Sequence, residues 1–497
     1  MKDLTTIADG LEALAQALGK LDSSFANHVL SVGKRILASV KSFLASEITP
    51  RCFEKCERRI ERLFREMARL LLERTVNQIE PSTKPNPVKW EDRVFHPYAR
   101  RERSMATRVG TIRYCRWLYQ NEYSFFVRGI APLDKRLGLT GNRVSPGVAH
   151  KLGRLAADMP QQVVIKELQE QFGINLSVDS YPRVVEHLAV EIRYRHDEAA
   201  LEQLCQWVAQ AAKTKGKHSV LLLVGRDGVH VPMRESWKEA ACATLAVYDK
   251  KRKRLGTIYL GQMPEEKQKT MTKRLTKVIT GVLNHDCSKS LRLRYVTDAG
   301  SVPRTYFENV LRKLKDPRSG KTLNWTWGVD FFHACEYLNQ LANSLYGTGT
   351  SKSQAWYRQQ RHILRHDPDG VRKVLTSAAQ IRRRHALEGT ADDYDQARGY
   401  LDRFRSHMDY AARRKSGDPI GSGVTEAGCK VIFNQRMKQS GMRWSKGGGQ
   451  HIVDLRTACR SHLWNRIWSL GLDDYTTLPE TNSTNNQQLT QKSSKAA

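Results

Sequence analysis

The sequence lacks any apolar run that approaches the roughly 18 residues a membrane-spanning helix needs. Its first twenty residues also lack the continuous apolar core of a signal peptide. Its nine cysteines are scattered, with no spacing typical of a disulfide framework. Together these absences favour a cytoplasmic protein with reduced thiols and no membrane partner.

Acidic residues are scarce relative to basic ones. The chain of 497 residues has 82 Lys and Arg against 51 Asp and Glu, which gives a formal net charge of +31. A surplus of this size must be spread over the folded surface, and a polyanion is the partner that it serves best. Membrane surfaces are anionic too, but no basic amphipathic segment stands apart from the rest. A polyanion, of which double-stranded DNA is one, is therefore the expected partner.

Residues 1–84 are expected to form an N-terminal helical region that ends in a proline-rich linker. Its later part carries one apolar stripe at helical spacing, which predicts either intramolecular core or a dimer seam, with core favoured because the pattern is short. Cys52 and Cys56 lie four residues apart, but two thiols without a second pair favour ordinary helix positions over a zinc site. The stripe comprises Ile60, Leu63, Phe64, Met67, Leu70 and Leu71.

Residues 85–144 form a small strand-containing basic region, in which apolar positions alternate with arginines and predict a hairpin with one basic face. Residues 145–200 have the pattern of a helix-turn-helix. A first helix with Val164 and Leu168 on one side would stop at Gly173, and a second would begin with Ser177 or, better, Ser180 as its N-cap. Arg183 on that second helix is a candidate DNA contact, although two packed helices without a DNA role remain the alternative.

After residue 200 the pattern becomes α/β. Three consecutive strands, expected to be antiparallel, are followed by two strand–helix units, which indicates a mixed sheet with helices. The expected catalytic domain comprises residues 201–345 and 416–473. A basic helical insertion at 346–415 interrupts it, and a tail at 474–497 with little apolar content is expected to be disordered.

Three carboxylates stand at the ends of these elements. Asp227 follows the apolar run 220–224, Asp298 follows the fourth strand, and Glu426 opens a helix after Gly421 and Gly423. If the first and fourth strands are neighbours, both aspartates emerge at one sheet edge, and Glu426 closes the site. Hard oxygen ligands suit Mg²⁺ or Mn²⁺, and two such ions about 4 Å apart can promote phosphodiester displacement. Taken singly, each carboxylate also fits a turn or helix-cap role.

Four blocks of the sequence carry a resemblance to a known family. These blocks are GRDGVHVPMR, YVTDAGSVPRTYF, VDFFHACEYL and IGSGVTEAGCKVIFNQRMKQSGMRW. They resemble bacterial insertion-sequence transposases of the ISKra group, DDE transposases with an RNase H-like catalytic core, over roughly residues 145–464. The resemblance implies DNA cleavage and 3′-hydroxyl strand transfer in the bacterial cytoplasm, at the nucleoid. It makes Asp227, Asp298 and Glu426 the catalytic triad and the ligands of two Mg²⁺ or Mn²⁺ ions.

The resemblance extends to a second pair of residues. Asp330 and His333 match the D-x-x-H signature of Mutator-like relatives, which implies support of the active site or contact with DNA. A helix cap plus a satisfied histidine is an equally weighted alternative. Related proteins often carry a cysteine zinc ribbon, of which only Cys115 remains here, so zinc is not expected in that region.

Basic and aromatic residues follow Glu426. Lys430 lies four residues after it, on the same helix face, where it can reach a phosphate near the metals. Trp444 can stack on an unpaired base, although core packing is favoured for a tryptophan. The candidate DNA contacts downstream of the triad are Lys430, Arg436, Lys438, Arg443 and Trp444.

The leading hypothesis from the sequence is a DDE transposase that acts on two element ends as a DNA-bound homodimer. An RNase H-fold nuclease that cuts without joining shares the triad. A non-catalytic helix-turn-helix repressor is the other alternative, and it leaves the ordered carboxylate blocks unexplained.

Overall fold

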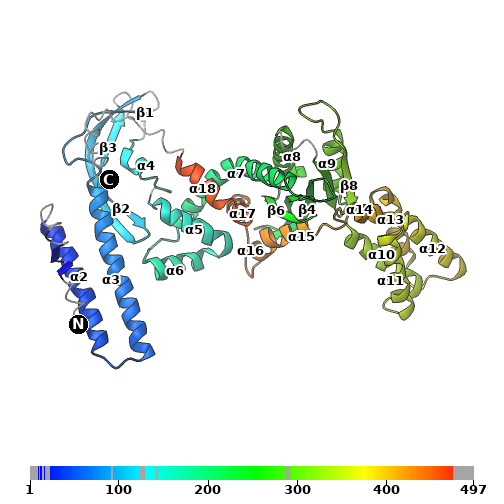
Figure 1. The fold of residues 1–497 in the computed structure, drawn as a ribbon, viewed down its shortest axis with the longest axis horizontal. Helices are drawn as coiled ribbons and strands as arrows, with labels where there is room; N and C mark the ends of the chain where they lie inside the picture. The colour runs from blue at the N-terminus through cyan, green and yellow to red at the C-terminus, as the bar shows by residue number, and fades with distance from the viewer. Residues whose placement is uncertain are drawn as a thin grey trace. The chain divides into compact units, whose positions relative to one another are not determined.

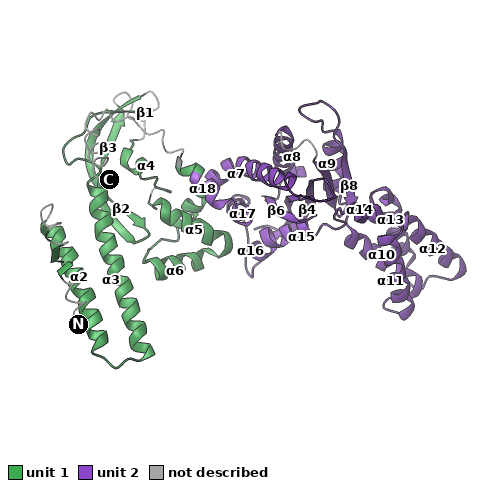
Figure 2. Ribbon diagram, viewed as in Figure 1, with its two compact units in different colours: residues 1–188, 470–497 green, residues 189–469 purple. Residues whose placement is uncertain are grey.

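A computed structural model describes residues 9–10, 12–13, 16, 23–90, 93–121, 129–141, 143–285 and 291–473. The expected disordered tail at 474–497 lies outside the described residues. The chain divides into two compact units, Met1–Leu188 with Leu470–Ala497, and Ala189–Ser469, shown in separate colours in Figure 2.

The first unit begins with an antiparallel pair of helices, α2 (Ser23–Leu44) and α3 (Pro50–Asn77). Leu63 of α3 is buried against Val32 and Ile36 of α2, so this part of the predicted stripe is intramolecular core. Phe64, in contrast, is 55% exposed, which shows that the stripe is wider than the surface that α2 covers.

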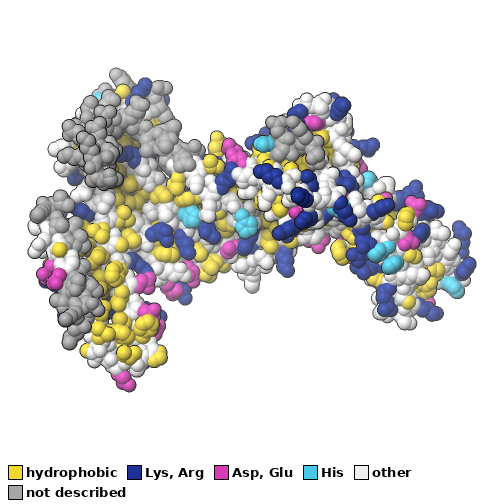
Figure 3. Space-filling view, viewed as in Figure 1, with side chains coloured by type: hydrophobic (Ala, Val, Ile, Leu, Met, Phe, Trp, Pro, Cys, Tyr) yellow, Lys and Arg dark blue, Asp and Glu magenta, His cyan; other side chains and the backbone are white. Residues whose placement is uncertain are grey.

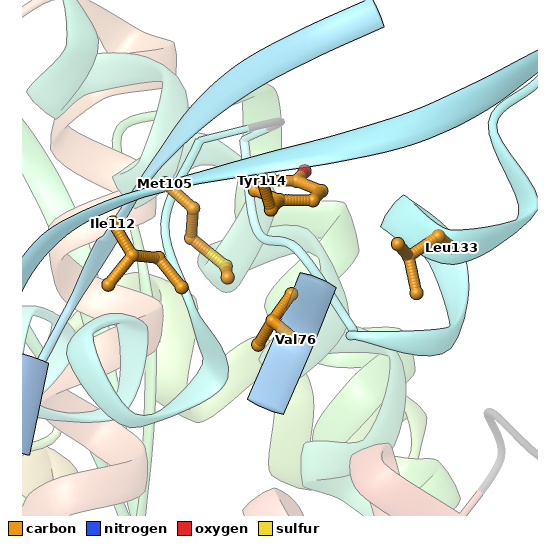
Figure 4. Close-up of a cluster of buried hydrophobic side chains, with 5 residues drawn as sticks. All are labelled: Val76, Met105, Ile112, Tyr114 and Leu133. Carbon is orange, nitrogen blue, oxygen red and sulfur yellow. The ribbon is translucent and has the colours of Figure 1, made fainter. Parts of the chain in front are cut away.

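A three-stranded antiparallel sheet follows, with β1 (Val88–Trp90), β2 (Arg93–Thr107) and β3 (Gly110–Asn121) in that order. The predicted hairpin is thus present as β2 and β3. Figure 4 shows its buried side chains gathered with one residue each from α3 and α4 (Pro132–Arg136). This cluster comprises Val76, Met105, Ile112, Tyr114 and Leu133.

Two arginines of this sheet form ion pairs within the unit. Asp134 accepts hydrogen bonds from Arg103 at 2.5 Å and from Arg116 at 2.8 Å, so these two side chains stabilise the fold.

The expected helix-turn-helix region contains α5 (Pro146–Asp158), α6 (Gln161–Phe172) and α7 (Ser180–Ala212). Gly173 ends α6 in the left-handed conformation, with φ 63°, as its position predicted. Of the two cap candidates, Ser177 is confirmed and the preferred Ser180 was wrong: Ser180 is the first helical residue, and the Ser177 hydroxyl accepts its amide at 3.1 Å. The connection is longer than the 3–4 residues usual for the motif. Moreover, α7 continues without a break through residue 200, where the sequence predicted the end of the helix-turn-helix region. That position therefore lies inside a helix and not in a linker.

The second unit is built on a mixed five-stranded sheet in the order β6-β5-β4-β7-β8. Figure 1 labels three of its strands, β4, β6 and β8. The strands are β4 (Leu221–Pro232), β5 (Trp237–Tyr248), β6 (Arg254–Gln262), β7 (Arg292–Thr297) and β8 (Trp325–Val329). The first three pair antiparallel, whereas β4–β7 and β7–β8 pair parallel. The α/β class, the antiparallel trio and the adjacency of the first and fourth strands are therefore confirmed.

Helices cover both faces of this sheet. Successive residues of a strand point to opposite faces. On β4, Arg226 contacts Gln268 and Thr272 on one face, whereas Asp227 contacts Cys429 on the other. The first face carries η1 (Glu266–Gln268), α8 (Lys269–Asn284) and α9 (Ser301–Asn309) with η3 (Leu311–Lys313), and the second carries α15 (Gly423–Cys429) and α17 (Lys446–Arg460).

The remaining helices lie between β8 and α15 in the sequence or follow α15. The expected insertion is helical: after α10 (Phe331–Tyr346) come α11 (Ser351–His366), α12 (Gly370–Arg384), α13 (Ala391–Arg403), η4 (Arg405–His407) and α14 (Tyr410–Lys415). After α15, a π-helical turn, η5 (Lys430–Asn434), leads into α16 (Gln435–Met437), and α18 (Trp464–Asp473) ends the described chain.

Candidate functional site

Asp227 lies within a strand rather than at its end. The expectation that the strand stops there was wrong, because β4 remains paired with β5 as far as Pro232↔Trp237. The pairing of β4 with its parallel neighbour β7 does end near Asp227, because the last pair between these two strands is Gly225↔Val296. Asp227 therefore stands just beyond the point where β4 loses its parallel neighbour, which leaves an open sheet edge beside its carboxylate.

Asp298 follows the end of β7 directly, as predicted. Its Oδ1 accepts the Gly300 amide at 2.9 Å, in the manner of an aspartate that stabilises a turn. Between them, Ala299 has φ 70°, a left-handed conformation that few non-glycine residues adopt. The turn thus fixes the backbone of Asp298 at the sheet edge while leaving its second oxygen, Oδ2, out of this hydrogen bond.

Glu426 is carried by α15, which packs unusually closely on β4 and β5. The hydroxyls of Thr425 and Thr244 lie 2.8 Å apart in the buried interface. A Cβ added at Gly225 would fall 1.8 Å from Thr425 Oγ1, so only glycine allows the helix this close. Gly225 is thus the contact point that places the helix of Glu426 beside Asp227.

The three carboxylates interact electrostatically. The pKa of Asp227 is raised, first by burial and then by the negative charge of Asp298, with a further contribution from Glu426. Hydrogen bonds from the Gly228 amide (2.7 Å) and, more weakly, the Cys429 thiol (3.5 Å) act in the opposite direction. Asp227 and Glu426, nearly 200 positions apart in the sequence, are thus close enough to interact electrostatically.

The carboxylates are not drawn together around one point. Within the described ranges, no three His, Cys, Asp or Glu side chains form a ready-made metal-ligand group. Glu426 is exposed, and its Oε1 accepts the Ser422 hydroxyl at 2.7 Å. Nor do the described cysteines, Cys115 among them, belong to a group of three or more such side chains that could hold zinc.

Asp330 is a buried helix cap that also holds the loop before α15. Its Oδ1 accepts the His333 amide at 2.6 Å, and its Oδ2 accepts the Ser422 amide. Ser422 in turn donates its hydroxyl to Glu426. The cap interpretation of Asp330 is therefore correct for the side chain, and the same carboxylate connects β8 to the segment that carries Glu426.

His333 lies near Asp298 through an aromatic contact. Its ring meets that of Tyr400 edge-on at 5.8 Å, and Tyr400 donates its hydroxyl to the backbone carbonyl of Asp298 at 2.8 Å. The His333 Nδ1 is 2.9 Å from Glu336. Burial, above all, raises the pKa of Tyr400, which keeps its hydroxyl protonated as a donor. Tyr400 belongs to the insertion, so this insertion supplies part of the site's wall.

The candidate DNA contacts after Glu426 divide into two groups. Lys430, Lys438 and Arg443 are exposed, and Lys430 lies at the start of the π-helical turn that follows α15. Arg436 is only 2% exposed and lies over the ring of Trp444 at 5.3 Å, so its expected role as a DNA contact is not supported by its position. Trp444 is half-buried rather than part of the core, and it donates its ring N–H to the Met437 carbonyl at 2.9 Å.

Arg183 is exposed on α7 and belongs to the first unit, whereas the carboxylates belong to the second. Three contributors to the site escaped sequence reasoning: Ser422, Cys429 and Tyr400. Ser422 lies four residues before Glu426, a spacing that offered a local signal. The other two contact aspartates more than 100 residues away and offered none.

Comparison with known proteins finds no matching family model and no matching curated protein. In the part of the chain that the structure describes, no helix is both long enough and apolar enough to cross a membrane.

Proposed function

We propose that this protein is a DDE transposase that cuts DNA at the ends of an insertion sequence and joins the freed 3′-hydroxyl to target DNA. One observation carries the proposal: Asp227, Asp298 and Glu426, from β4, the end of β7 and α15, come close enough that, after burial, the charges of the other two also raise the pKa of Asp227. Structural turns and caps do not require three like charges to share a field, whereas a divalent-metal site does.

The sheet supports the same proposal. An RNase H-like core is expected to have three antiparallel strands followed by two parallel ones on the side of the first strand, and β6-β5-β4-β7-β8 has that arrangement. The carboxylates fall on the first strand, after the fourth strand and on a helix after the insertion. This order agrees with the four sequence blocks that resemble the ISKra group.

The donor atoms fit the expected ions. Carboxylate oxygens are the ligands that Mg²⁺ and Mn²⁺ prefer, and a bound cation would relieve the repulsion that raises the pKa of Asp227. When bound by Asp227, Asp298 and Glu426, two such ions would supply an activated attacking oxygen and charge stabilisation of the leaving oxygen. The protein's part is to hold the ligands: β4 and the 298–300 turn fix the aspartates, and the Thr425–Gly225 contact and Ser422 fix Glu426.

The test is a cleavage and joining assay in Mg²⁺ with DNA taken from both sides of the coding sequence. Wild type is compared with Asp227→Asn, Asp298→Asn and Glu426→Gln, which remove a charge with little change of shape. The matched control is Glu308→Gln, because Glu308 is an exposed carboxylate of α9 outside the site. We expect each triad variant to bind DNA but to lose cutting and joining together, and the control to do both.

Other outcomes select the alternatives. Cutting without strand-transfer product would identify a nuclease. Binding without any metal-dependent cutting by wild type would favour a repressor, and active triad variants would refute the site itself.

A further inference from the structure

Helix α8 carries a row of lysines on the sheet face opposite to Asp227. Lys269, Lys273 and Lys277 are exposed and recur every four residues, so their Cα atoms rise by about 6 Å each along the helix. From Lys267 to His285 the sequence contains no Asp or Glu. Among the described residues, Lys273 and Lys277 have no carboxylate within ion-pair distance, and Lys269 only the exposed Glu266 at 3.6 Å.

These lysines line a cleft of about 1030 Å³ between α7 and α8, wholly within the second unit. Threonines 272, 276 and 280 line it as well, although the hydroxyl of Thr272 accepts from Arg226 and that of Thr276 donates to the Thr272 carbonyl. Two carboxylates also line it. Burial acts to raise the pKa of Asp197, but the hydrogen bond with His196 and the charge of Arg274 lower it and keep the carboxylate ionised. Its charge is balanced by the buried Arg274 at 2.8 Å, whereas Glu198 is exposed at the α7 wall. The cleft therefore has a clear cationic surplus.

The lining defines the kind of anion. No aromatic side chain contributes to it among the described residues, so a nucleobase has nothing to stack on. The exposed positions of α8 are lysine, asparagine and threonine, with no large apolar side chain to enter a bilayer. Evenly spaced ammonium groups match a repeating phosphodiester, and Figure 3 shows Lys and Arg gathered over this unit.

We infer that the α8 row is a second DNA-binding surface, which holds the phosphate backbone of a duplex on the face of the sheet away from the triad. Arg226 contacts α8 and Asp227 contacts α15, so the two surfaces lie on opposite faces of one strand. The surface binds without reading sequence, because lysines on phosphates carry no base information. The inference deepens the proposed function, on which its choice of DNA as partner rests.

The experiment measures binding of the full chain to a duplex by fluorescence anisotropy between 50 and 300 mM salt, without divalent metal. Each phosphate contact contributes about 0.9 to the slope of log K against log salt. The triple variant Lys269→Gln, Lys273→Gln, Lys277→Gln is therefore expected to lower the slope by about 2 to 3, and to weaken binding about a hundredfold at 0.1 M salt. Conversely, Glu198→Gln should strengthen binding.

The control is Lys34→Gln, Lys41→Gln, Lys55→Gln, which removes the same charge from exposed positions on α2 and α3. Its slope should stay within about 1 of wild type. Equal slopes for wild type and the α8 variant would overturn the inference, and so would equal losses in both triple variants, because net charge alone would then explain them. Absence of DNA binding by wild type would refute it as well.

The two proposals fail separately. A wild type that binds with an α8-dependent slope but never cuts DNA in Mg²⁺ refutes the transposase and leaves the surface. Normal cutting with an unchanged slope refutes the surface alone.

Discussion

Replacement of Gly225 by alanine tests how Glu426 is placed. The new Cβ would lie 1.8 Å from Thr425 Oγ1 and 3.1 Å from Thr244 Oγ1, in an interface where both threonines are buried. The chain has two ways to respond. Either the Thr425 side chain turns away and breaks its 2.8 Å hydrogen bond to Thr244, or α15 moves off the sheet.

The cost follows from these contacts. Overpacking a filled interface costs about 1–3 kcal/mol. Leaving buried hydroxyls without partners costs about 1–3 kcal/mol more. We therefore expect the free energy of unfolding to fall by about 2–6 kcal/mol. Because Glu426 follows Thr425 directly, cleavage should fall about tenfold or more under conditions in which the variant is still folded.

Urea unfolding of the full chain, followed by circular dichroism, measures the first effect, and the Mg²⁺-dependent cleavage assay measures the second. Gly399→Ala is the control, because nothing lies within 4 Å of its added Cβ and glycine is unfavourable inside α13. This control should be as stable as wild type or up to about 1 kcal/mol more stable. A Gly225→Ala protein with wild-type stability and cleavage would refute the close seating of α15.

Three further predictions concern the same site. Ser422→Ala removes the hydroxyl that holds Glu426 Oε1 and should lower cleavage several-fold with little change in melting temperature; equal cleavage would show that this bond positions nothing. In wild type, the two carboxylate oxygens of Asp330 accept the amides of His333 and Ser422, and Asp330→Asn leaves only one oxygen to accept them. The free energy of unfolding in urea should fall by about 1–3 kcal/mol, whereas an unchanged urea midpoint would contradict the capping role. The raised pKa of Asp227 means that the native state holds a proton which the unfolded state has already lost. Without divalent metal, stability should therefore fall as pH rises from about 4 through the raised pKa. Asp227→Asn should lack this fall and melt higher than wild type in EDTA at pH 7, and a lower melting temperature would refute the raised pKa of Asp227.

Local patterns predicted much of this fold because they report local physics. The apolar run 220–224 did form a buried strand, and Gly173 did end a helix, since both depend on neighbouring residues alone. Asp298 was placed correctly after β7 for the same reason. The first and fourth strands were predicted as neighbours only conditionally, since pairing between distant segments leaves no local signal.

The errors arose where tertiary contacts replace local rules. Asp227 was expected at the end of its strand, but β4 continues to Pro232, and Gly225 is needed for its contact with the side chain of Thr425, 200 residues later. Arg436 looked like a surface cation, but it is buried against Trp444, which a count of charges cannot reveal. The contact of Tyr400 with Asp298 depends on how the insertion folds back on the sheet.

The central claim, that carboxylates from β4, β7 and α15 form one divalent-metal site, is tested most directly by Mn²⁺ binding to the full chain, followed by water-proton relaxation. We predict saturable binding by wild type and by Glu308→Gln, and a large loss of affinity in each of Asp227→Asn, Asp298→Asn and Glu426→Gln. Wild-type affinity in any one of these three variants would remove that carboxylate from the site. Absence of saturable binding by wild type would contradict the claim as a whole.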